Sequence, residues 1–408
     1  MRKQIIYLFI FLLTGLSCAP LDKENPYEEQ LNDFQLSVKM PVGFENHSVA
    51  GFEMLIEEMN TGSSYRTMTD DKGSVSMRLP GGLYRVTVNG KVFTDVFNGT
   101  ADKLPLTSAG IQMNLPLVHS KAGMIVIKEL YNGGCKKAPI EGDYQSDQYM
   151  ILHNNDYQVQ YLDSLCIGSL SPFNATGANY FVSKDPETGE SIFPDFLPVA
   201  QAVWQIGGDG DDFPLQPGED AVICFRGAID HTIQYPLSVN LNKEGYFVCY
   251  DIAQFDNTLY HPAPGDKISS DRIISVLIKT GRGSAYTLSV SSPAVLIWKS
   301  KGIAMGDFVQ VPDNLTFVPG SIDKVVKVPY DWAYDALEVF NAQSSINSKR
   351  FPPALDASYV LQTDSFLGRS LMRYVDEEES AKAGYEVLKD SNNSGKDFYE
   401  SEKQSLHE

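Results

Sequence analysis

Basic residues are scarce in this sequence, which has 33 Lys and Arg against 52 Asp and Glu and a formal net charge of −19. Loss of residues 1–17 would remove Arg2 and Lys3 and no acidic residue, which takes −19 to −21. A surface this negative repels polyanions. We therefore expect no nucleic-acid partner and no binding to anionic lipid through a general electrostatic field.

The apolar run near the amino terminus is too short for a transmembrane helix. Residues 5–13 are nine apolar residues, whereas a bilayer needs about 20. The run follows Arg2 and Lys3 and precedes the small residues Gly15 and Ser17 and then Cys18. This order resembles a bacterial lipoprotein signal peptide, residues 1–17. The resemblance implies that Cys18 becomes the first residue and carries diacylglycerol as a thioether; an ordinary signal peptide with an incidental cysteine is the alternative.

The residues after Cys18 indicate a destination. Residue 19 is Ala rather than the Asp that holds many lipoproteins in the inner membrane, and Asp22-Lys23-Glu24 is similar to surface-export signals. We expect an outer-membrane, lipid-anchored chain, at the cell surface rather than the periplasmic face. Residues 18–32 are interpreted as the lipidated cysteine and its tether.

Catalytic motifs are also missing. None of the six His residues is spaced as HxH, HxxxH or HExxH, and there is no CxxC pair or phosphate-binding loop. The stretch GRGSA around Ser284 lacks the second glycine of a nucleophile elbow. These absences predict a protein that is not an enzyme and that has no cofactor beyond its acyl anchor.

Two short stretches offer weak alternatives. In GGDGDDF, Asp209, Asp211 and Asp212 could supply oxygen ligands to calcium, but residue 220 is Asp where an EF-hand loop needs Glu. We favour a solvated acidic turn before a strand at residues 213–215. A metal-dependent hydrolase would require Asp209 and Asp211 to meet His231.

The neighbouring pair Asp230-His231 could tune an imidazole for acid–base work. Successive side chains of an extended strand point to opposite faces, however. A histidine that bonds the backbone of a loop is the favoured interpretation.

Four cysteines follow Cys18: Cys135, Cys166, Cys224 and Cys249. Cys224 and Cys249 lie in apolar, strand-like runs, AVICFRG and GYFVCYD. Buried free thiols are the preferred interpretation, and a Cys224–Cys249 disulfide is the alternative that an oxidising compartment would permit.

Glycine, proline and aromatic residues are plentiful. The chain has 32 Gly, 22 Pro, 21 Tyr and 21 Phe, a composition typical of short aromatic strands joined by frequent turns. Its length exceeds the roughly 250–300 residues at which single cores stop growing. We therefore predict an all-β protein with two Ig-like β-sandwich domains.

The first domain is expected at residues 33–118. An Asp70–Gly73 turn precedes Val75, Met77 and Leu79, which alternate with polar residues, and the chain returns through Tyr84 and Val86 after a Leu-Pro-Gly-Gly turn. The pattern resembles carboxypeptidase-regulatory-like, or transthyretin-like, sandwiches. That resemblance implies a spacer or binding module.

The second domain is expected at residues 120–408. Five features follow one another along this stretch: a strand carrying Glu129, an Asn154-Asn155 turn before Leu162-Asp163, a Pro217-Gly218 turn, Arg373, and an Asp-Ser-Asn-Asn-Ser closure at 390–394. This order resembles a lamin-tail domain with loop insertions. We expect Asn154 and Asn393 to satisfy backbone groups, Arg373 to pair with an acid at the sheet edge, and the acidic residues 376–379 to form a solvated loop.

Four further segments resemble an uncharacterised family of Gram-negative lipoproteins that pairs these two domains. They are Ala-Ile-Asp-His-Thr at 228–232, Ser-x-x-Leu at 238–241, Pro-Ala-x-x-Ile at 293–297 and Phe-Pro-Pro-x-Leu-Asp-Ala at 351–357. The family has no assigned activity. We expect a non-enzymatic binding or scaffolding accessory with a protein partner in the outer membrane, such as a receptor or uptake system; a purely structural envelope protein is the alternative.

Overall fold

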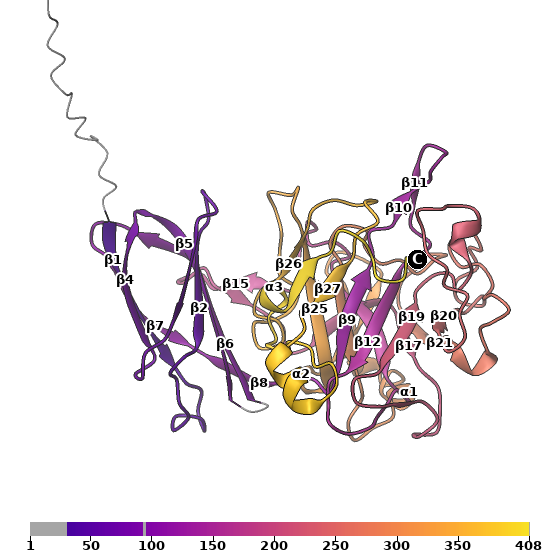
Figure 1. Ribbon diagram of the computed structural model, residues 1–408, viewed down its shortest axis with the longest axis horizontal. Helices are drawn as coiled ribbons and strands as arrows, with labels where there is room; N and C mark the ends of the chain where they lie inside the picture. Colours follow the sequence, from indigo (N-terminus) through magenta and orange to yellow (C-terminus); the bar gives the residue numbers. More distant parts are fainter. Residues whose placement is uncertain (1–30, 93–94, 408) are drawn as a thin grey trace, which may run out of the picture.

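The computed structural model describes residues 31–92 and 95–407. The expected signal peptide, Cys18 and most of the tether lie outside these residues. Strands dominate the described part of the chain (Figure 1), so the all-β expectation is confirmed. None of the helices in the described part is long and apolar enough to cross a membrane.

The amino-terminal domain is a sandwich of two sheets. Strand order is β3-β2-β5-β6-β8 in one sheet and β4-β1-β7 in the other. The strands are β1 (Leu31–Lys39), β2 (Glu53–Glu58), β3 (Ser64–Met68), β4 (Ser74–Pro80), β5 (Gly82–Val92), β6 (Asp95–Leu106), β7 (Ile111–Pro116) and β8 (Val118–Lys121).

Local sequence explains these strands. Val75 and Leu79 of β4 face the core beside Phe34 and Tyr84, while Ser76 is exposed. Gly73 has a φ of +74°, and a Cβ there would lie 2.7 Å from the Val38 side chain. Glycine therefore permits both the turn and its close packing.

The carboxyl-terminal domain is built on one large curled sheet. Its main path runs β26-β25-β22-β14-β17-β21-β20-β19-β12-β9-β27-β28. The bounds are β9 (Ile125–Tyr131), β12 (Tyr149–Asn154), β14 (Cys166–Leu170), β17 (Leu197–Gln205), β19 (Asp220–Cys224), β20 (Phe247–Cys249), β21 (Ile273–Lys279), β22 (Ala294–Trp298), β25 (Ala333–Asn341), β26 (Val360–Gln362), β27 (Leu371–Arg373) and β28 (Phe398–Glu400).

The two ends of this path approach each other, because β26 lies beside β28 and β25 lies beside β9. The curled sheet encloses a core around Trp204, Phe225 and Tyr286. A second core, around Trp298 and Trp332, lies against α1 (Met305–Phe308). The sheet is therefore buried on both faces, which explains its near-continuous apolar strands.

Smaller elements complete the domain. Strands β23 (Leu315–Phe317) and β24 (Lys324–Val328) extend the sheet from β17. There are also three two-stranded ribbons, which pair β10 (Cys135–Lys136) with β11 (Asp143–Tyr144), β13 (Gln160–Tyr161) with β18 (Pro214–Leu215), and β15 (Ser183–Lys184) with β16 (Ser191–Ile192). The remaining helices are α2 (Glu377–Ala383), α3 (Ser394–Asp397) and the 3₁₀ turns η1 (His231–Ile233), η2 (Ser270–Arg272), η3 (Pro312–Asn314) and η4 (Tyr330–Trp332).

The acidic segment at 376–379 is not a loop, so that expectation was wrong. Asp376 caps α2 by accepting a hydrogen bond from the Glu379 N–H at 3.1 Å, and Gly384 ends the helix with a φ of +80°. Three glutamates occupy the first turn. Negative charge there is favourable because the helix amino terminus carries partial positive charge.

The two domains contact each other through the five-stranded sheet (Figure 1). Asn89 and Asn98 each donate an Nδ2–H to the Ser391 carbonyl at 2.9 Å, and Thr100 donates to the Ala357 carbonyl at 3.2 Å. Arg85 also donates to the Tyr359 hydroxyl. Side chains from one sheet face thus contact two backbone carbonyls and one hydroxyl within residues 357–391, and these hydrogen bonds hold the domains against each other.

Candidate functional site

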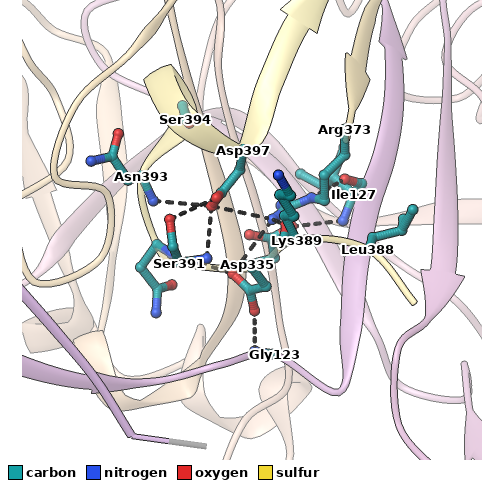
Figure 2. A network of polar contacts seen from close by, with 12 residues as sticks. Gly123, Ile127, Asp335, Arg373, Leu388, Lys389, Ser391, Asn393, Ser394 and Asp397 are labelled. Carbon is teal, nitrogen blue, oxygen red and sulfur yellow. Dashed lines mark hydrogen bonds and ion pairs between the residues drawn. The ribbon is translucent and has the colours of Figure 1, made fainter. Parts of the chain in front are cut away.

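A cluster of buried charged side chains surrounds Arg373 on β27 (Figure 2). Its guanidinium contacts Asp335, Asp390 at 3.4 Å and Asp397 at 3.7 Å, and the four side chains are at most 3% exposed. Arg373 Nε also donates to the Ile127 carbonyl at 2.7 Å. The expected pairing of Arg373 is confirmed, but with three acids in the interior.

The three carboxylates point at backbone N–H groups as well as at Arg373. Asp335 accepts from Ile127 N at 2.6 Å, and Asp397 accepts from Ser391 N at 2.8 Å. Asp390 accepts from Gly123 N. The cluster thereby holds β9, β25, β27 and the 389–397 segment together, and its oxygens are occupied by the protein itself.

Burial dominates the electrostatics of this cluster. It raises the pKa of Asp335 to about 7 and that of Asp397 to about 6, although the Arg373 charge opposes both rises. The surroundings of Asp335 and Asp397 thus disfavour their charged forms.

A second buried ion pair contacts the start of the 351–357 segment, one of the segments that carried the family resemblance. Arg350 Nη2 lies 2.7 Å from Glu338 Oε1, and both side chains are 0% exposed. Glu338 also accepts from the backbone N–H groups of Arg350 and Phe351 at 2.8 and 3.0 Å. Asp356 accepts from Ser394 N at 2.8 Å. The segment is fixed by buried charges, which indicates a structural role.

Of the two expected turn asparagines, one behaves as expected. Asn154 donates to the Gln158 and Leu215 carbonyls at 2.8 and 2.7 Å. Neither side-chain polar atom of Asn393 has a hydrogen-bond partner among the described residues. The expectation for Asn393 was wrong, because the carboxylate of Asp397 accepts the hydrogen bonds from the backbone N–H groups of Ser391 and Asn393 in this turn.

The backbone N–H groups of the acidic loop at 207–213 donate hydrogen bonds to two carboxylates. Asp163 accepts from the N–H groups of Gly210, Asp212 and Phe213 at 3.1, 3.0 and 3.0 Å, and Asp212 accepts from Asp209 N at 2.8 Å. Burial alone would raise the Asp163 pKa, but the three backbone donors outweigh it and the pKa is lowered. Sequence reasoning missed Asp163 as the organiser of this turn.

His231 is held by a separate set of contacts. Its Nε2–H donates to the Gly227 carbonyl at 2.8 Å, so Nδ1 of the neutral ring accepts from the Tyr144 hydroxyl at 2.6 Å. Burial lowers the His231 pKa, which agrees with a neutral ring. Asp230 instead accepts from Thr232 N at 3.0 Å as the cap of η1. The expected bond between His231 and the backbone is confirmed, and His231 is the first residue of the 3₁₀ turn η1 rather than a loop residue.

The hydrolase alternative needed Asp209, Asp211 and His231 in one group. Among residues 31–92 and 95–407, no three His, Cys, Asp or Glu side chains are grouped so that they could hold a metal ion. The structure therefore does not bring these three residues together as a metal site.

The four described cysteines are free and buried, including Cys224 and Cys249. Burial raises the pKa of both thiols. It also raises the pKa of Cys135 and of Cys166 to about 12. Thiols in this state are poor nucleophiles.

One buried cluster was not foreseen. Asp147, 0% exposed, accepts from the Ser238 and Tyr131 hydroxyls at 2.6 and 3.1 Å, and burial raises its pKa. Its Oδ1 has no hydrogen-bond partner among the described residues. Ser238 lies 91 positions along the chain, so no local spacing could have revealed the contact. Ser238 is itself 0% exposed, which argues against a substrate site.

Comparison with known proteins gives a family match over part of the chain. The model of a family of proteins of unknown function, DUF4876, matches residues 216–405. No curated protein matches the chain.

A crystal structure of a DUF4876 family protein from Bacteroides thetaiotaomicron VPI-5482 is similar to this chain, with a TM-score of 0.56 and 23% identity over 90% of this chain and 94% of that one. At that identity the likeness shows the fold. A proposed adhesin from Bacteroides ovatus ATCC 8483 reaches a TM-score of 0.21 at 10% identity, over 87% of this chain and 99% of its own. The major pilin subunit of Bacillus cereus reaches 0.17 at 9% identity, over 82% and 99%. Neither of these two scores carries an argument.

Proposed function

We propose that this protein is a non-enzymatic, lipid-anchored accessory of the outer membrane that binds or scaffolds a partner at the cell surface. In this proposal Cys18 carries the acyl anchor, residues 33–118 form a carboxypeptidase-regulatory-like module, and residues 120–408 form a lamin-tail-like module. The partner belongs to an outer-membrane receptor or uptake system.

The observation that carries the proposal is the fixed docking of one β-domain on the other. Asn89, Asn98, Thr100 and Arg85 all reach from the five-stranded sheet to residues 357–391. Lys396 adds a charged contact to Glu53 at 2.8 Å. Two modules held in one orientation present their surfaces at a set distance, which suits a scaffold.

The buried polar groups fit the same function. The carboxylates around Arg373, Glu338 and Asp163 accept hydrogen bonds from the chain's own N–H groups and cations. Groups used in this way stabilise the fold and are not free to act on a substrate.

The anchor is tested by growing cells with a labelled fatty acid and comparing the wild type with Cys18→Ala. Wild-type protein should carry label and the variant should carry none. Equal labelling, or an unmodified mature amino terminus by intact mass, would remove the anchor from the proposal.

The partner is tested by crosslinking in intact cells followed by mass spectrometry. We expect adducts that contain outer-membrane proteins and that protease added to whole cells can reach. A chain recovered alone, or one whose deletion weakens the envelope without affecting uptake, would favour the structural alternative.

A further inference from the structure

The Arg373 cluster, formed by Arg373, Asp335, Asp390 and Asp397, lies next to the contact between the two domains. Asp390 accepts a hydrogen bond from the N–H of Gly123 (Figure 2). Gly123 lies between β8, the last strand of the first domain, and β9, the first strand of the second. The cluster therefore binds the segment that joins the domains.

Asp397 of the same cluster holds a short turn at residues 391–393. Its carboxyl group accepts from the Ser391 N–H at 2.8 Å, from the Ser391 hydroxyl at 2.6 Å and from the Asn393 N–H at 3.2 Å. Asn392, between them, has a φ of +49°, in the sparsely populated left-handed region. The turn keeps this uncommon conformation because Asp397 binds the N–H groups on both sides of Asn392.

The other side of this turn binds the first domain. The Ser391 carbonyl accepts from Asn89 of β5 and Asn98 of β6, each at 2.9 Å. The Asn392 side chain donates to the Ser120 hydroxyl of β8 at 2.9 Å. Asn98 is 0% exposed, so water is excluded from this contact. The Arg373 cluster and the first domain therefore bind opposite sides of one turn.

The charges of the Arg373 cluster do not balance. Three carboxyl groups face one guanidinium group, so full ionisation leaves two negative charges uncompensated among side chains that are at most 3% exposed. Lys396 of α3 is a further cation near Asp397, but its Nζ lies 2.8 Å from Glu53. Burial raises the pKa of Asp397 to about 6 and that of Asp335 to about 7. The interior therefore disfavours the fully ionised cluster.

A neutral Asp397 can make all of its contacts with the turn. Its Oδ2 accepts from the N–H groups of Ser391 and Asn393, and its Oδ1 faces the Ser391 hydroxyl. A proton on Oδ1 donates to that hydroxyl and leaves both N–H groups with their acceptor. Protonation thus removes a buried negative charge without the loss of a hydrogen bond.

We propose that the Arg373 cluster makes the contact between the two domains pH-dependent: a neutral Asp397 favours the docked arrangement, and ionisation of Asp397 loosens it. The reason is linkage. Separation of the domains exposes the 391–393 turn to water and restores an ordinary pKa to Asp397. A group whose pKa is raised in the docked state stabilises that state at low pH, and this contribution is lost as the pH rises through about 6. Glu53 stays ionised above about pH 5, because its pKa is lowered.

The first experiment follows amide hydrogen exchange in the full-length protein by mass spectrometry from pH 5 to pH 8. Protection factors, which remove the pH dependence of intrinsic exchange, should fall about tenfold over this range for peptides covering 118–125 and 389–394. This factor follows from a pKa that moves from about 6 to an ordinary value on opening. Peptides from β12 should exchange more slowly at every pH, because opening of the domain contact does not unfold that strand.

Two results of this experiment would overturn the inference. One is protection of 118–125 and 389–394 that does not change, or rises, between pH 5 and pH 8. The other is exchange in these peptides that is as slow as in β12 at every pH, since the contact would then open only when the whole protein unfolds.

Asp397→Asn supplies a side chain that does not ionise. Its amide oxygen can accept from the Ser391 and Asn393 N–H groups, and its N–H can donate to the Ser391 hydroxyl. Protection of 118–125 and 389–394 should therefore lose most of its pH dependence, whereas Asp331→Asn, at a side chain that is 72% exposed, should retain it. A wild-type pH profile in Asp397→Asn would overturn the inference.

Asn89→Ala/Asn98→Ala tests the same contact from the first domain and leaves the Arg373 cluster intact, so it serves even where Asp397→Asn does not fold. Removal of the two donors to the Ser391 carbonyl should speed exchange of 389–394 at pH 5 at least about tenfold. Unchanged exchange would show that the first domain does not protect the turn, which would overturn the inference.

This inference goes beyond the proposed function, since it concerns contacts within the described residues and does not depend on an anchor at Cys18 or on a partner. A contact that proves independent of pH leaves the accessory function intact. Loss of the anchor or of the partner leaves the pH-dependent contact intact.

Discussion

Lys396 of α3 and Glu53 of β2 stand 343 positions apart in the chain, yet Lys396 Nζ lies 2.8 Å from Glu53 Oε2. Their side chains are 9% and 32% exposed, so the pair lies at the edge of the domain contact. Burial alone would raise the Glu53 pKa, but hydrogen bonds and charges from Lys396 and Arg66 outweigh it and the pKa is lowered.

The first prediction concerns this contact. Glu53→Gln should loosen the docking of the two domains and lower the free energy of unfolding by about 1–3 kcal/mol, since the amide can still accept from Lys396 but no longer carries the negative charge that offsets a mostly buried ammonium group. Limited proteolysis between β8 and β9, together with urea unfolding, measures both effects. Asp33→Asn, which breaks an exposed pair with Arg78 at 3.7 Å, is the control.

The same pair predicts a response to acid. A carboxylate whose pKa is lowered on folding contributes stability above its unfolded pKa, and that contribution is lost as the pH falls through the folded value. Proteolysis between β8 and β9 should therefore increase in acid for the wild type and change less for Glu53→Gln. Identical pH profiles for the two proteins would contradict the role assigned to Glu53.

The second prediction concerns Asp397 beside Arg373. Its pKa is raised from 3.8 to about 6 by burial. A carboxyl group whose pKa is raised on folding contributes stability at pH values below its pKa in the unfolded chain. This contribution is lost as the pH rises through its pKa in the folded protein. The loss between about pH 4 and pH 6 amounts to at most about 3 kcal/mol.

Asp397→Asn should accordingly flatten the pH dependence of unfolding in that window, whatever its effect on absolute stability. Asp331→Asn, whose side chain is 72% exposed, should retain the wild-type slope. Urea unfolding at half-unit pH steps measures the slope. A steeper pH dependence of the unfolding free energy in Asp397→Asn would show that the direction assigned to the Asp397 pKa shift is wrong.

The third prediction concerns the buried thiols. In a Cys18→Ala background, thiol reagents at pH 8 should leave the native protein unmodified, because a thiol with a pKa of about 12, as for Cys135 and Cys166, is ionised to only about one part in ten thousand. After denaturation all four should react. An intact mass lower by two hydrogens, with Cys224 and Cys249 joined, would restore the disulfide alternative.

The fourth prediction concerns Asp163 and the acidic loop. Asp163→Ala leaves three backbone N–H groups without their acceptor and should cost at least about 1–3 kcal/mol of unfolding free energy. Asp211→Ala, in the same loop, should cost little. Added calcium should not shift the melting temperature; a calcium-dependent rise that Asp211→Ala abolishes would reinstate a cation site.

Some of the local structure could be predicted because strand and turn signals depend on adjacent residues. Alternation at Val75, Met77 and Leu79 predicted β4, and the turn expected at Asp70–Gly73 is present, with a φ of +74° at Gly73. The same kind of local signal was present at 376–384 but was misjudged as a loop. An aspartate cap, first-turn glutamates and a terminal glycine there specify a short helix.

Composition and local patterns predicted an all-β chain of short strands with a strongly negative charge; the anchor expected at Cys18 lies outside the described residues. The shared contacts of three acids with Arg373, the role of Asp163 in the 207–213 loop and the contacts of residues 357–396 with the first domain could be recognised only once the chain was folded. Alternation and turn chemistry operate over a few residues, whereas a buried charge takes its partner from any strand that the curled sheet places beside it, and contacts such as Ile127–Arg373 join residues 246 positions apart.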